Sequence, residues 1–409
     1  MTSFAEITLP EIKADCRFYS GYKPCHKHDG CPGCPHYSPR GEQILIIKLG
    51  AMGDVLRTKA ILPALKREHP NSWVVWLTDA GSESLARDPM VDEVRPFTLA
   101  GIAAVEGRHY ARLICLDKDA HAVSLAARIH ADRKQGFAPT AYNTISVWNE
   151  GAMYALRLGL SDELKYRINE KSMPQIVSEA ADLPYNGEEY NLTISTDAQM
   201  RAEAKWRAMM PEIAPPRAKH GPEYTGHFLH RNIAGPAPAA PTKIIGLNTG
   251  CGPVFATKGW TTENMAALVG MLKERADTRV VLLGGPREAH IHRAVMAAAG
   301  DMAGKRIFDA GTDNPLDVFF GLVQKCDLVL SADSLAMHVA IALKRPVIAW
   351  FGPTCAQEVD LFGRGEKIVT DFACSPCYLK TCPQDVFCMD AMTPQTVLAA
   401  IDRVLGVTA

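Results

Sequence analysis

The stretch ILIIKLGAMGDVLRTKAILPALK, residues 44–66, begins as an apolar run and ends with the spacing of an amphipathic helix. A run that is apolar on both faces predicts a strand inside a parallel sheet, and the small residues after it predict a tight turn. Asp54 lies at the bend between the two. The stretch therefore predicts a strand-turn-helix unit of a doubly wound α/β domain, with a carboxylate where the strand ends.

Composition limits the possible classes of protein. The chain has 409 residues and a formal net charge of −1, with 47% hydrophobic and 22% charged residues. These values are typical of a globular protein with two domains, and they do not predict nucleic-acid binding. No apolar run approaches the roughly 20 residues of a membrane span, and the N-terminus lacks the layout of a signal peptide. We expect a cytoplasmic protein.

Strand and helix patterns alternate along the rest of the chain. In the first half, strands are expected at 73–78 and 112–117 and a helix at 122–131. In the second half, strands are expected at 243–248, 279–285, 327–333 and 346–352, with helices at 263–275, at 287–299 and up to Leu343. We therefore predict Rossmann-like domains at 41–210 and 243–409, a linker rich in proline, glycine and alanine at 211–242, and a cysteine-rich segment at 1–40.

Ligands of such domains bind where strands end and helices begin. In KLGAMGDVLRT, residues 48–58, Gly50 and Gly53 are expected in the turn, and Asp54 would either cap the helix or accept a proton from a hydroxyl group. Thr58 follows Asp54 by one helical turn, so we expect both side chains on one face.

Three further strand ends carry candidate residues. Lys258 follows the strand at 243–248 and could contact a diphosphate. Alternatively, this segment only starts the next helix, with Thr261 or Thr262 and nearby Glu263 as capping residues. Asp333 and Ser334 begin a helix that contains His338, and this helix start could hold an anion, although capping and packing also explain these residues. Gly284 could admit a nucleotide or simply form a turn. No G-x-G-x-x-G follows the first strand, which disfavours a nicotinamide enzyme.

Asp117 and Asp119 form a D-x-D pair in the sequence LDKDA. Such pairs bind a metal ion and a sugar diphosphate in one fold of glycosyltransferases. The setting of this pair, after a buried strand of a doubly wound domain, is unsuited to that role, so we interpret it as a chance match.

Four motifs occurring in order, KLGAMGDVLRT, TKGW, DSLAMHVAIALKRPVIAWFGPT and CSPCYLKTC, closely resemble glycosyltransferase family 9, the ADP-heptose heptosyltransferases of lipopolysaccharide synthesis. The resemblance implies a GT-B fold, in which two Rossmann-like domains face each other across a cleft. It implies that Asp54 is the general base, that Lys258 and Thr249 contact the diphosphate, that Asp333 and Ser334 hold the donor, and that His338 supports their loop. The candidate substrate-binding residues are Gly53, Thr58, Thr249, Gly250, Lys258, Gly284, Asp333, Ser334 and His338.

The resemblance implies an inverting transfer of a heptose or related sugar from ADP-heptose or a similar nucleotide sugar. The acceptor would be a hydroxyl group of a glycan, of a lipid-linked lipopolysaccharide core or of a protein, and membrane association would be peripheral at most. No catalytic cofactor is expected. Two departures stand out: Leu335 replaces a glycine usual in the family, and residues 1–40 are additional. The alternative functions are a non-catalytic sugar-nucleotide or glycan-binding module, and a metal-cluster adaptor that docks through residues 1–40.

Eight of the 12 cysteines form two clusters. The first contains Cys16, Cys25, Cys31 and Cys34, with three histidines interleaved, and the second contains Cys374, Cys377, Cys382 and Cys388. Such spacing predicts structural metal ions, with zinc first and iron second, rather than disulfides in a reducing compartment. Neither cluster is expected at a strand end that binds substrate. The remaining thiols, Cys115, Cys251, Cys326 and Cys355, are expected in the core.

Overall fold

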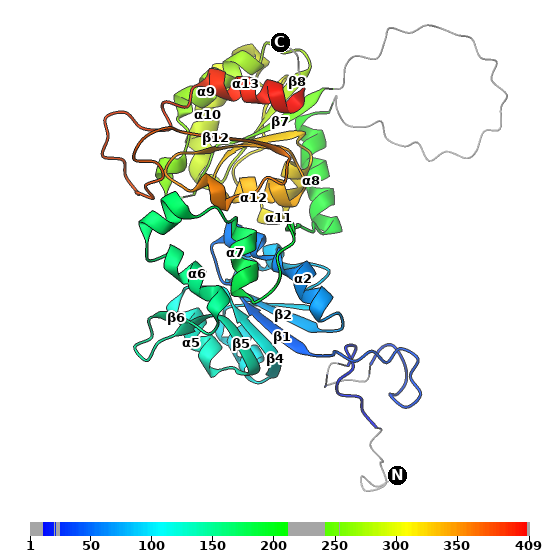
Figure 1. Cartoon of the computed structure of the whole chain (residues 1–409). Coiled ribbons are helices and arrows are strands. Elements are labelled where there is room, and N and C mark those ends of the chain that lie inside the picture. The colour runs from blue at the N-terminus through cyan, green and yellow to red at the C-terminus, as the bar shows by residue number, and fades with distance from the viewer. Residues whose placement is uncertain (1–10, 20, 22–24, 212–241, 253, 407–409) are drawn as a thin grey trace, which may run out of the picture. The chain divides into compact units, whose positions relative to one another are not determined.

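The computed structural model describes residues 11–19, 21, 25–211, 242–252 and 254–406 (Figure 1). The chain forms two compact units, with the boundary between Tyr190 and Asn191. Helix α8 (Thr196–Met209) therefore belongs to the second unit, where Arg201 pairs with Asp317 at 2.5 Å, whereas the sequence pattern predicts that the first domain extends over 41–210. The predicted linker at 211–242 lies almost wholly outside the described residues.

The first unit is built on a six-stranded sheet with the order β3-β2-β1-β4-β5-β6. Pairing is parallel throughout except between β5 and β6. The strands are β1 (Gln43–Ile47), β2 (Trp73–Thr78), β3 (Glu93–Pro96), β4 (His109–Cys115), β5 (His130–Pro139) and β6 (Ile145–Val147). The central strand β1 is buried from Ile44 to Ile47, as its apolar run predicts.

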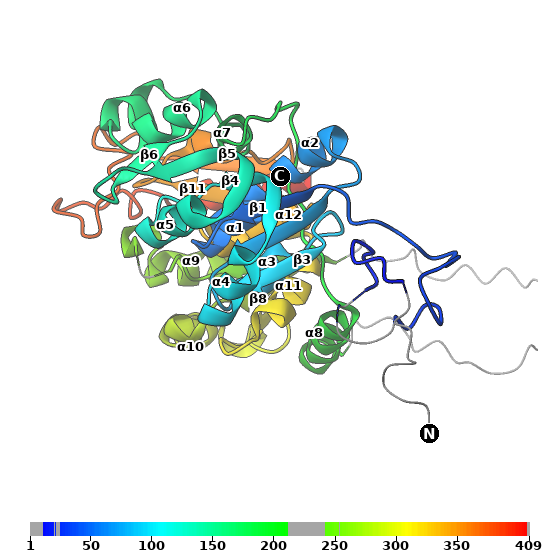
Figure 2. The same cartoon turned by 90° about the horizontal axis from the view of Figure 1, so that it is seen from below.

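The described part of this unit contains five α-helices that connect these strands, followed after β6 by an α-helix, a π-helical turn and a further α-helix. They are α1 (Met52–Thr58), α2 (Ile61–Glu68), α3 (Glu83–Ala86), α4 (Leu99–Glu106), α5 (Ala120–Arg128), α6 (Glu150–Leu158), η2 (Leu164–Ile168) and α7 (Met173–Ala180). Figure 2 shows α3 and α4 beside β3 at one edge of the sheet and α6 beside β6 at the other. The one amphipathic helix expected at the end of the stretch 44–66 is two helices, divided at Lys59, whose buried ammonium group lies 3.2 Å from the Asp88 carboxylate.

The second unit repeats the same architecture. Its sheet has the order β12-β11-β10-β7-β8-β9, all parallel, with β7 (Lys243–Asn248), β8 (Thr278–Leu283), β9 (Ile307–Asp309), β10 (Leu328–Ala332), β11 (Val347–Phe351) and β12 (Gly365–Val369). After α8, its helices are η3 (Ala256–Lys258), α9 (Thr262–Leu272), η4 (Pro286–Glu288), α10 (Ala289–Ala299), η5 (Gly300–Met302), α11 (Leu316–Gln324), α12 (Leu335–Ala342), η6 (Ala356–Glu358) and α13 (Pro394–Leu405).

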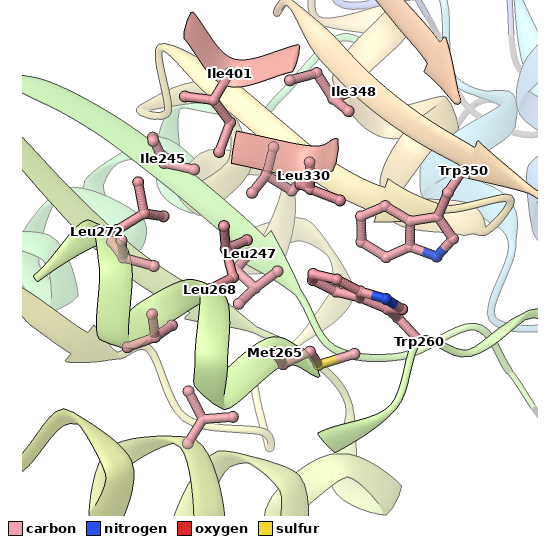
Figure 3. Packing of buried hydrophobic residues seen from close by; sticks show 14 of the residues in the cluster. Ile245, Leu247, Trp260, Met265, Leu268, Leu272, Leu330, Ile348, Trp350 and Ile401 are labelled. Carbon is pink, nitrogen blue, oxygen red and sulfur yellow. The ribbon is translucent and has the colours of Figure 1, made fainter. Parts of the chain in front are cut away.

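One hydrophobic cluster of the second unit lies between the sheet and helices α9 and α13 (Figure 3). Leu268 of α9 and Ile401 of α13 are fully buried, beside Leu330 of β10. The rings of Trp260 and Trp350 lie 5.3 Å apart, and the Trp260 indole donates a hydrogen bond to the Met392 carbonyl at 2.8 Å. This contact ties the chain just before α9 to the segment just before α13.

Both sheets reverse their strand order beside the first strand of the unit. Chain connections leave β1 toward β2 and later return to β4 on the other side, and β7 is placed in the same way between β8 and β10. Ligands of doubly wound sheets bind at the carboxyl ends of the strands that flank such a switch point. The two Rossmann-like domains predicted from the sequence are confirmed, and each has one expected binding edge.

The described part of the N-terminal segment lies at the opposite end of the first sheet, where β1 and β2 begin (Figure 1). The guanidinium groups of Arg17 and Arg40 lie 5.7 and 4.8 Å from the ring centre of Trp73, the first residue of β2. Cys16 and Pro39 form an isolated β-bridge. Cation–π contacts therefore attach this segment to the first unit, away from the carboxyl ends of the strands.

Among the described residues, no helix combines the length and apolar character that a membrane crossing requires.

A pH effect on stability is expected from Glu93 on the edge strand β3. Burial raises its pKa, but hydrogen bonds and charges from Arg108 and Arg95 outweigh burial and lower the pKa from 4.5 to about 2. A lowered folded-state pKa stabilises the fold above the unfolded value of 4.5, and this contribution is lost as the pH falls toward 2. With solvent screening included, we expect a loss of about 1–2 kcal/mol across that window.

Urea unfolding at several pH values measures this loss. Glu93→Gln, which cannot ionise, should show a shallower fall in the free energy of unfolding between pH 5 and about pH 3 than the wild-type chain. Equal slopes for the two proteins would contradict the assignment.

Candidate functional site

Asp54 lies in the first turn of α1, immediately after the carboxyl end of β1. Its carboxylate is 2.6 Å from the Arg57 guanidinium, and its side chain is 39% exposed. Gly53 is also in α1 rather than in the preceding turn. The side chain that sequence reasoning singled out is thus solvent-accessible at the switch point of the first sheet.

Thr58 does not share this exposure. It is only 1% exposed, so its hydroxyl packs inside the first unit although it follows Asp54 by one helical turn. The expectation that both side chains line one accessible face is wrong, because α1 is seven residues long and its last turn is covered by the fold. Thr58 therefore has a packing role.

Lys258 and Asp333 meet at the switch point of the second sheet. Lys258 ends η3 after β7, Asp333 follows β10, and their charged atoms are 3.5 Å apart. Both side chains are mostly buried, at 15% and 20% exposure. Two residues that are 75 positions apart in the sequence thus place a cation and a carboxylate together at the edge where a ligand is expected.

Ser334 and His338 support this edge from helix α12. Ser334 is the N-cap residue, and its own side chain makes no capping hydrogen bond to the helix. The Ser334 hydroxyl lies 2.9 Å from the Ser331 hydroxyl. His338 is one turn farther on and 5% exposed, with its Nε2 atom 3.9 Å from Asp333 Oδ1. The helix start presents its positive end beside the Lys258 ammonium group.

Asn248 links the two strand ends, and sequence reasoning missed it. Its side-chain amide lies 2.5 Å from the Gly250 carbonyl, 3.1 Å from the Ser331 hydroxyl and 3.3 Å from the Ser334 hydroxyl. The detectable signal was a polar residue at the end of the otherwise apolar run KIIGLN. Asn248 joins β7 to β10 at the switch point, so it fixes the loop before Lys258 relative to the start of α12.

Thr249 uses its side chain inside the protein. Its hydroxyl is 3.1 Å from the Leu283 carbonyl and 3.0 Å from Nε2 of His292, and Thr249 is 3% exposed. The other ring nitrogen of His292 is 2.6 Å from the Asp309 carboxylate, which can only accept, so this nitrogen donates. The Thr249 hydroxyl thus belongs to a chain of hydrogen bonds that runs through His292 to Asp309 at the end of β9, and the contact of Thr249 with a diphosphate stays a prediction.

Gly250 and Gly284 are required by packing. A Cβ atom on Gly250 would lie 2.6 Å from the Glu288 carboxyl carbon. A Cβ atom on Gly284 would lie 2.8 Å from both His292 Nε2 and Thr249 Oγ1. Glu288 in turn accepts a hydrogen bond from the Gly285 amide at 2.8 Å. These glycines let the loops after β7 and β8 approach each other closely.

The second cysteine cluster lies at a strand end, contrary to our expectation. The amides of Cys377 and Tyr378 donate to the Pro353 carbonyl, just beyond β11, at 3.2 and 2.8 Å. The Thr257 hydroxyl donates to the Leu379 carbonyl at 2.8 Å, and the Phe255 and Tyr378 rings meet edge to face. The loop at 374–388 therefore packs against the segment that carries Lys258, because the chain must return from β12 past the carboxyl ends of the strands.

Both clusters bring their cysteines near one another. The first four cysteines line a single cavity together with His28 and His36. Burial, followed by the charges of Cys377, Cys374 and Cys382, raises the pKa of Cys388 to about 11. All eight thiols are free. Within the described ranges, no three histidine, cysteine, aspartate or glutamate side chains are arranged as a ligand set for a metal ion.

Three of the four isolated cysteines are core residues, as predicted. Cys115, Cys326 and Cys355 are at most 3% exposed, whereas Cys251 is half-buried in the loop before Lys258. Burial raises the pKa of Cys115 and of Cys326 to about 12. These two thiols are therefore unreactive core groups.

Substitution of Gly284 by alanine tests the packing of the loops. The added methyl group would displace His292 or Thr249, so we expect a loss of about 1–3 kcal/mol in the free energy of unfolding. Gly270→Ala in α9 is the matched control, since its Cβ atom meets no atom within 4 Å. That change should stabilise the chain by about 0.5–1 kcal/mol. Similar effects of the two changes in urea unfolding would refute the packing assignment.

Comparisons with known proteins agree with this architecture. A solved family 9 glycosyltransferase from Veillonella parvula DSM 2008 is 17% identical, with a TM-score of 0.64 and coverage of 90% of this chain and 98% of that one. The E. coli ADP-heptose lipopolysaccharide heptosyltransferase II is 18% identical, with a TM-score of 0.60 and coverage of 89% and 98%. These likenesses confirm the GT-B fold class.

Sequence comparison gives the family. Lipooligosaccharide heptosyltransferase 2 of Campylobacter jejuni is 36% identical over 81 residues, which are 19% of this chain and 26% of that relative. The match thus spans about a quarter of the relative's length. The model of glycosyltransferase family 9 (heptosyltransferase) matches residues 151–387, more than half of the chain. This chain belongs to glycosyltransferase family 9.

Proposed function

We propose that this protein is an inverting glycosyltransferase that transfers a heptose or a related sugar from ADP-heptose or a similar nucleotide sugar to a hydroxyl group. One observation carries the proposal: in a member of family 9, Lys258 and Asp333 meet 3.5 Å apart at the switch point of the second sheet. A nucleotide ligand is expected at that edge of a doubly wound domain.

The donor would bind at this edge of the second unit. Lys258 supplies a compact positive charge, and the start of α12, which the Ser334 side chain does not cap, supplies amide donors, which together suit a diphosphate. Asp333 would accept hydrogen bonds from sugar hydroxyls while holding Lys258 in place. Asn248, His338 and the hydrogen-bonded chain from Thr249 to Asp309 would keep the loops in position.

The acceptor would bind near Asp54 on the first unit. Asp54 would take the proton of the acceptor hydroxyl as its oxygen forms a bond to the anomeric carbon of the sugar. The bond from this carbon to the diphosphate oxygen breaks in the same step, and the nucleoside diphosphate leaves with the electron pair. Lys258 and the α12 amides would stabilise the charge that develops on the leaving diphosphate.

Replacing Asp54 with asparagine tests the general base. Asparagine keeps the shape but cannot accept the proton, so kcat should fall about 10²- to 10⁴-fold, while stabilisation of the chain by ADP remains. The measurements are release of ADP from ADP-heptose with a heptose-accepting lipid or glycan panel, and thermal unfolding with and without ADP.

Asp197→Asn is the matched control, because Asp197 also lies in the first turn of a helix and pairs with an arginine, Arg201, at 2.8 Å. It should leave transfer unchanged. Full turnover by Asp54→Asn would remove Asp54 from the mechanism. A wild-type chain that is stabilised by ADP-heptose but releases no ADP with any acceptor would support the alternative, a non-catalytic binding module.

We also keep the proposal that both cysteine clusters bind structural metal, with zinc first and iron second. The donor chemistry fits, since each cluster offers four thiols within a short segment and the thiols are close neighbours. In the second cluster, a metal ion would hold a loop whose Leu379 carbonyl accepts the Thr257 hydroxyl beside Lys258. No catalytic step requires it.

Removal of the second cluster tests this link between metal and donor binding. Cys382→Ser should lower the metal content by about one ion per chain and raise the Kd for ADP several-fold, because the loop against Thr257 loosens. Cys326→Ala, in which a buried isolated cysteine is changed, should alter neither value. Elemental analysis and calorimetry measure both. An unchanged metal content in Cys382→Ser would refute the second site.

The remaining parts of the proposal concern partners and location. The acceptor would be a glycan, a lipid-linked lipopolysaccharide core or a protein hydroxyl, and nucleic acid is not a partner. We propose a cytoplasmic location with at most peripheral contact with the membrane, where lipid-linked acceptors are found.

A further inference from the structure

The carboxylate of Asp117 is held between the end of β4 and the loop that follows β1. One oxygen, Oδ2, accepts the amides of Leu49 at 2.9 Å and Gly50 at 3.2 Å, and lies 3.2 Å from the Lys48 ammonium group. The other oxygen accepts the Asp119 amide at 3.0 Å. Asp117 is 7% exposed, so its hydrogen-bonding capacity is directed to the protein.

The same loop is held on its other side by β2. The Leu49 carbonyl accepts the Thr78 hydroxyl and the Asp79 amide, both at 3.1 Å. The Trp76 indole lies 3.4 Å from the Lys48 carbonyl. The amides of Leu49 and Gly50 thus bond to Asp117 beyond β4, and the carbonyls of Lys48 and Leu49 bond to the end of β2.

The charges around Asp117 explain why Lys48 is buried with it. Burial, followed by the charges of Asp117 and Asp119, raises the pKa of the neighbouring Asp79, whereas Lys48 lowers it. Lys48 is 8% exposed and offsets the negative charge of the group. The interaction is therefore a buried ion pair completed by two backbone amides, and removal of one partner leaves the others unsatisfied.

The held loop leads directly into α1. Only Ala51 separates Gly50 from the helix, and the Asp54 amide donates to the Ala51 carbonyl at 2.8 Å. The helix is short, and its N-cap residue Ala51 has no capping side chain, so the loop before it helps to set the position of its first turn while α3 and α7 pack against the helix. We propose that Asp117 is a positioning residue that holds Asp54 in place for the reaction, an inference that rests on the proposed function.

Asp117→Asn tests this role, with Asp92→Asn as the matched control. Asp92 also accepts a strand amide, Val74, and pairs with a lysine, Lys66, but it lies where β2 begins. In Asp117→Asn, kcat should fall on the order of 10- to 100-fold because a small displacement of the base is costly. The KM for the donor and stabilisation by ADP should not change. Asp92→Asn should keep kcat within about twofold of wild type.

Hydrogen exchange provides a readout that needs no substrate. Peptides covering residues 48–58 should exchange faster in Asp117→Asn and at the wild-type rate in Asp92→Asn. The double change with Asp54→Asn should be no slower than Asp54→Asn alone, because a base that is absent cannot be misplaced. Thr78→Val, which removes only the hydroxyl bonded to Leu49, tests the loop from the other side if Asp117→Asn does not fold.

Two results would overturn the proposal. One is unchanged exchange over residues 48–58 in Asp117→Asn, or in Thr78→Val where that variant replaces it. The other is a fall in kcat that is no larger than the loss of folded protein, where the folded fraction is measured as the fraction of chains that bind ADP. A wild-type chain without transferase activity would count against the proposed function, whereas the exchange result would still decide whether Asp117 holds the loop.

Discussion

Parallel pairing of a buried central strand with neighbours on both sides is the constraint from which the rest of this structure follows. β1 pairs with β2 and β4, and β7 pairs with β8 and β10, in parallel register. Parallel neighbours require helical crossovers, and these bring every strand end of the same direction to one edge. Unpaired amides and helix starts collect there, so polar side chains at this edge serve a ligand or the loops that hold it.

The same arrangement is used differently in the two units. At the first edge, the Asp54 side chain is 39% exposed and follows a loop fixed by Asp117. The charged side chains of Asp117 and Lys48 are buried there. At the second edge, Lys258 and Asp333 are the central charged pair, and a network through Asn248 and His292 fixes the loops around them. Under the proposed function, the carboxylate of the first unit would serve an acceptor hydroxyl, and the cation of the second unit would serve a leaving diphosphate.

The cysteine clusters differ in where they attach to this framework. The segment that carries the first cluster contacts Trp73, where β2 begins, through Arg17 and Arg40. Asp54 lies at the opposite end of that sheet. The second lies against Pro353 and Thr257, next to the segment that carries Lys258. Similar spacing in sequence thus corresponds to a peripheral position in one case and to a position beside the candidate donor site in the other.

The sequence by itself determined the elements with a strong period: the apolar strands, the helices between them, the two-domain α/β class and the positions of Asp54, Lys258 and Asp333 at strand ends. Only the tertiary structure decided which polar residues point inward, because the residue type is the same whether or not a neighbouring strand buries its hydroxyl or carboxylate. It buried Thr58 and Thr249, changed Asp117 from an apparent chance match into a loop anchor, and placed α8 with the second unit. These outcomes depend on contacts between residues far apart in the chain, which local periodicity cannot record.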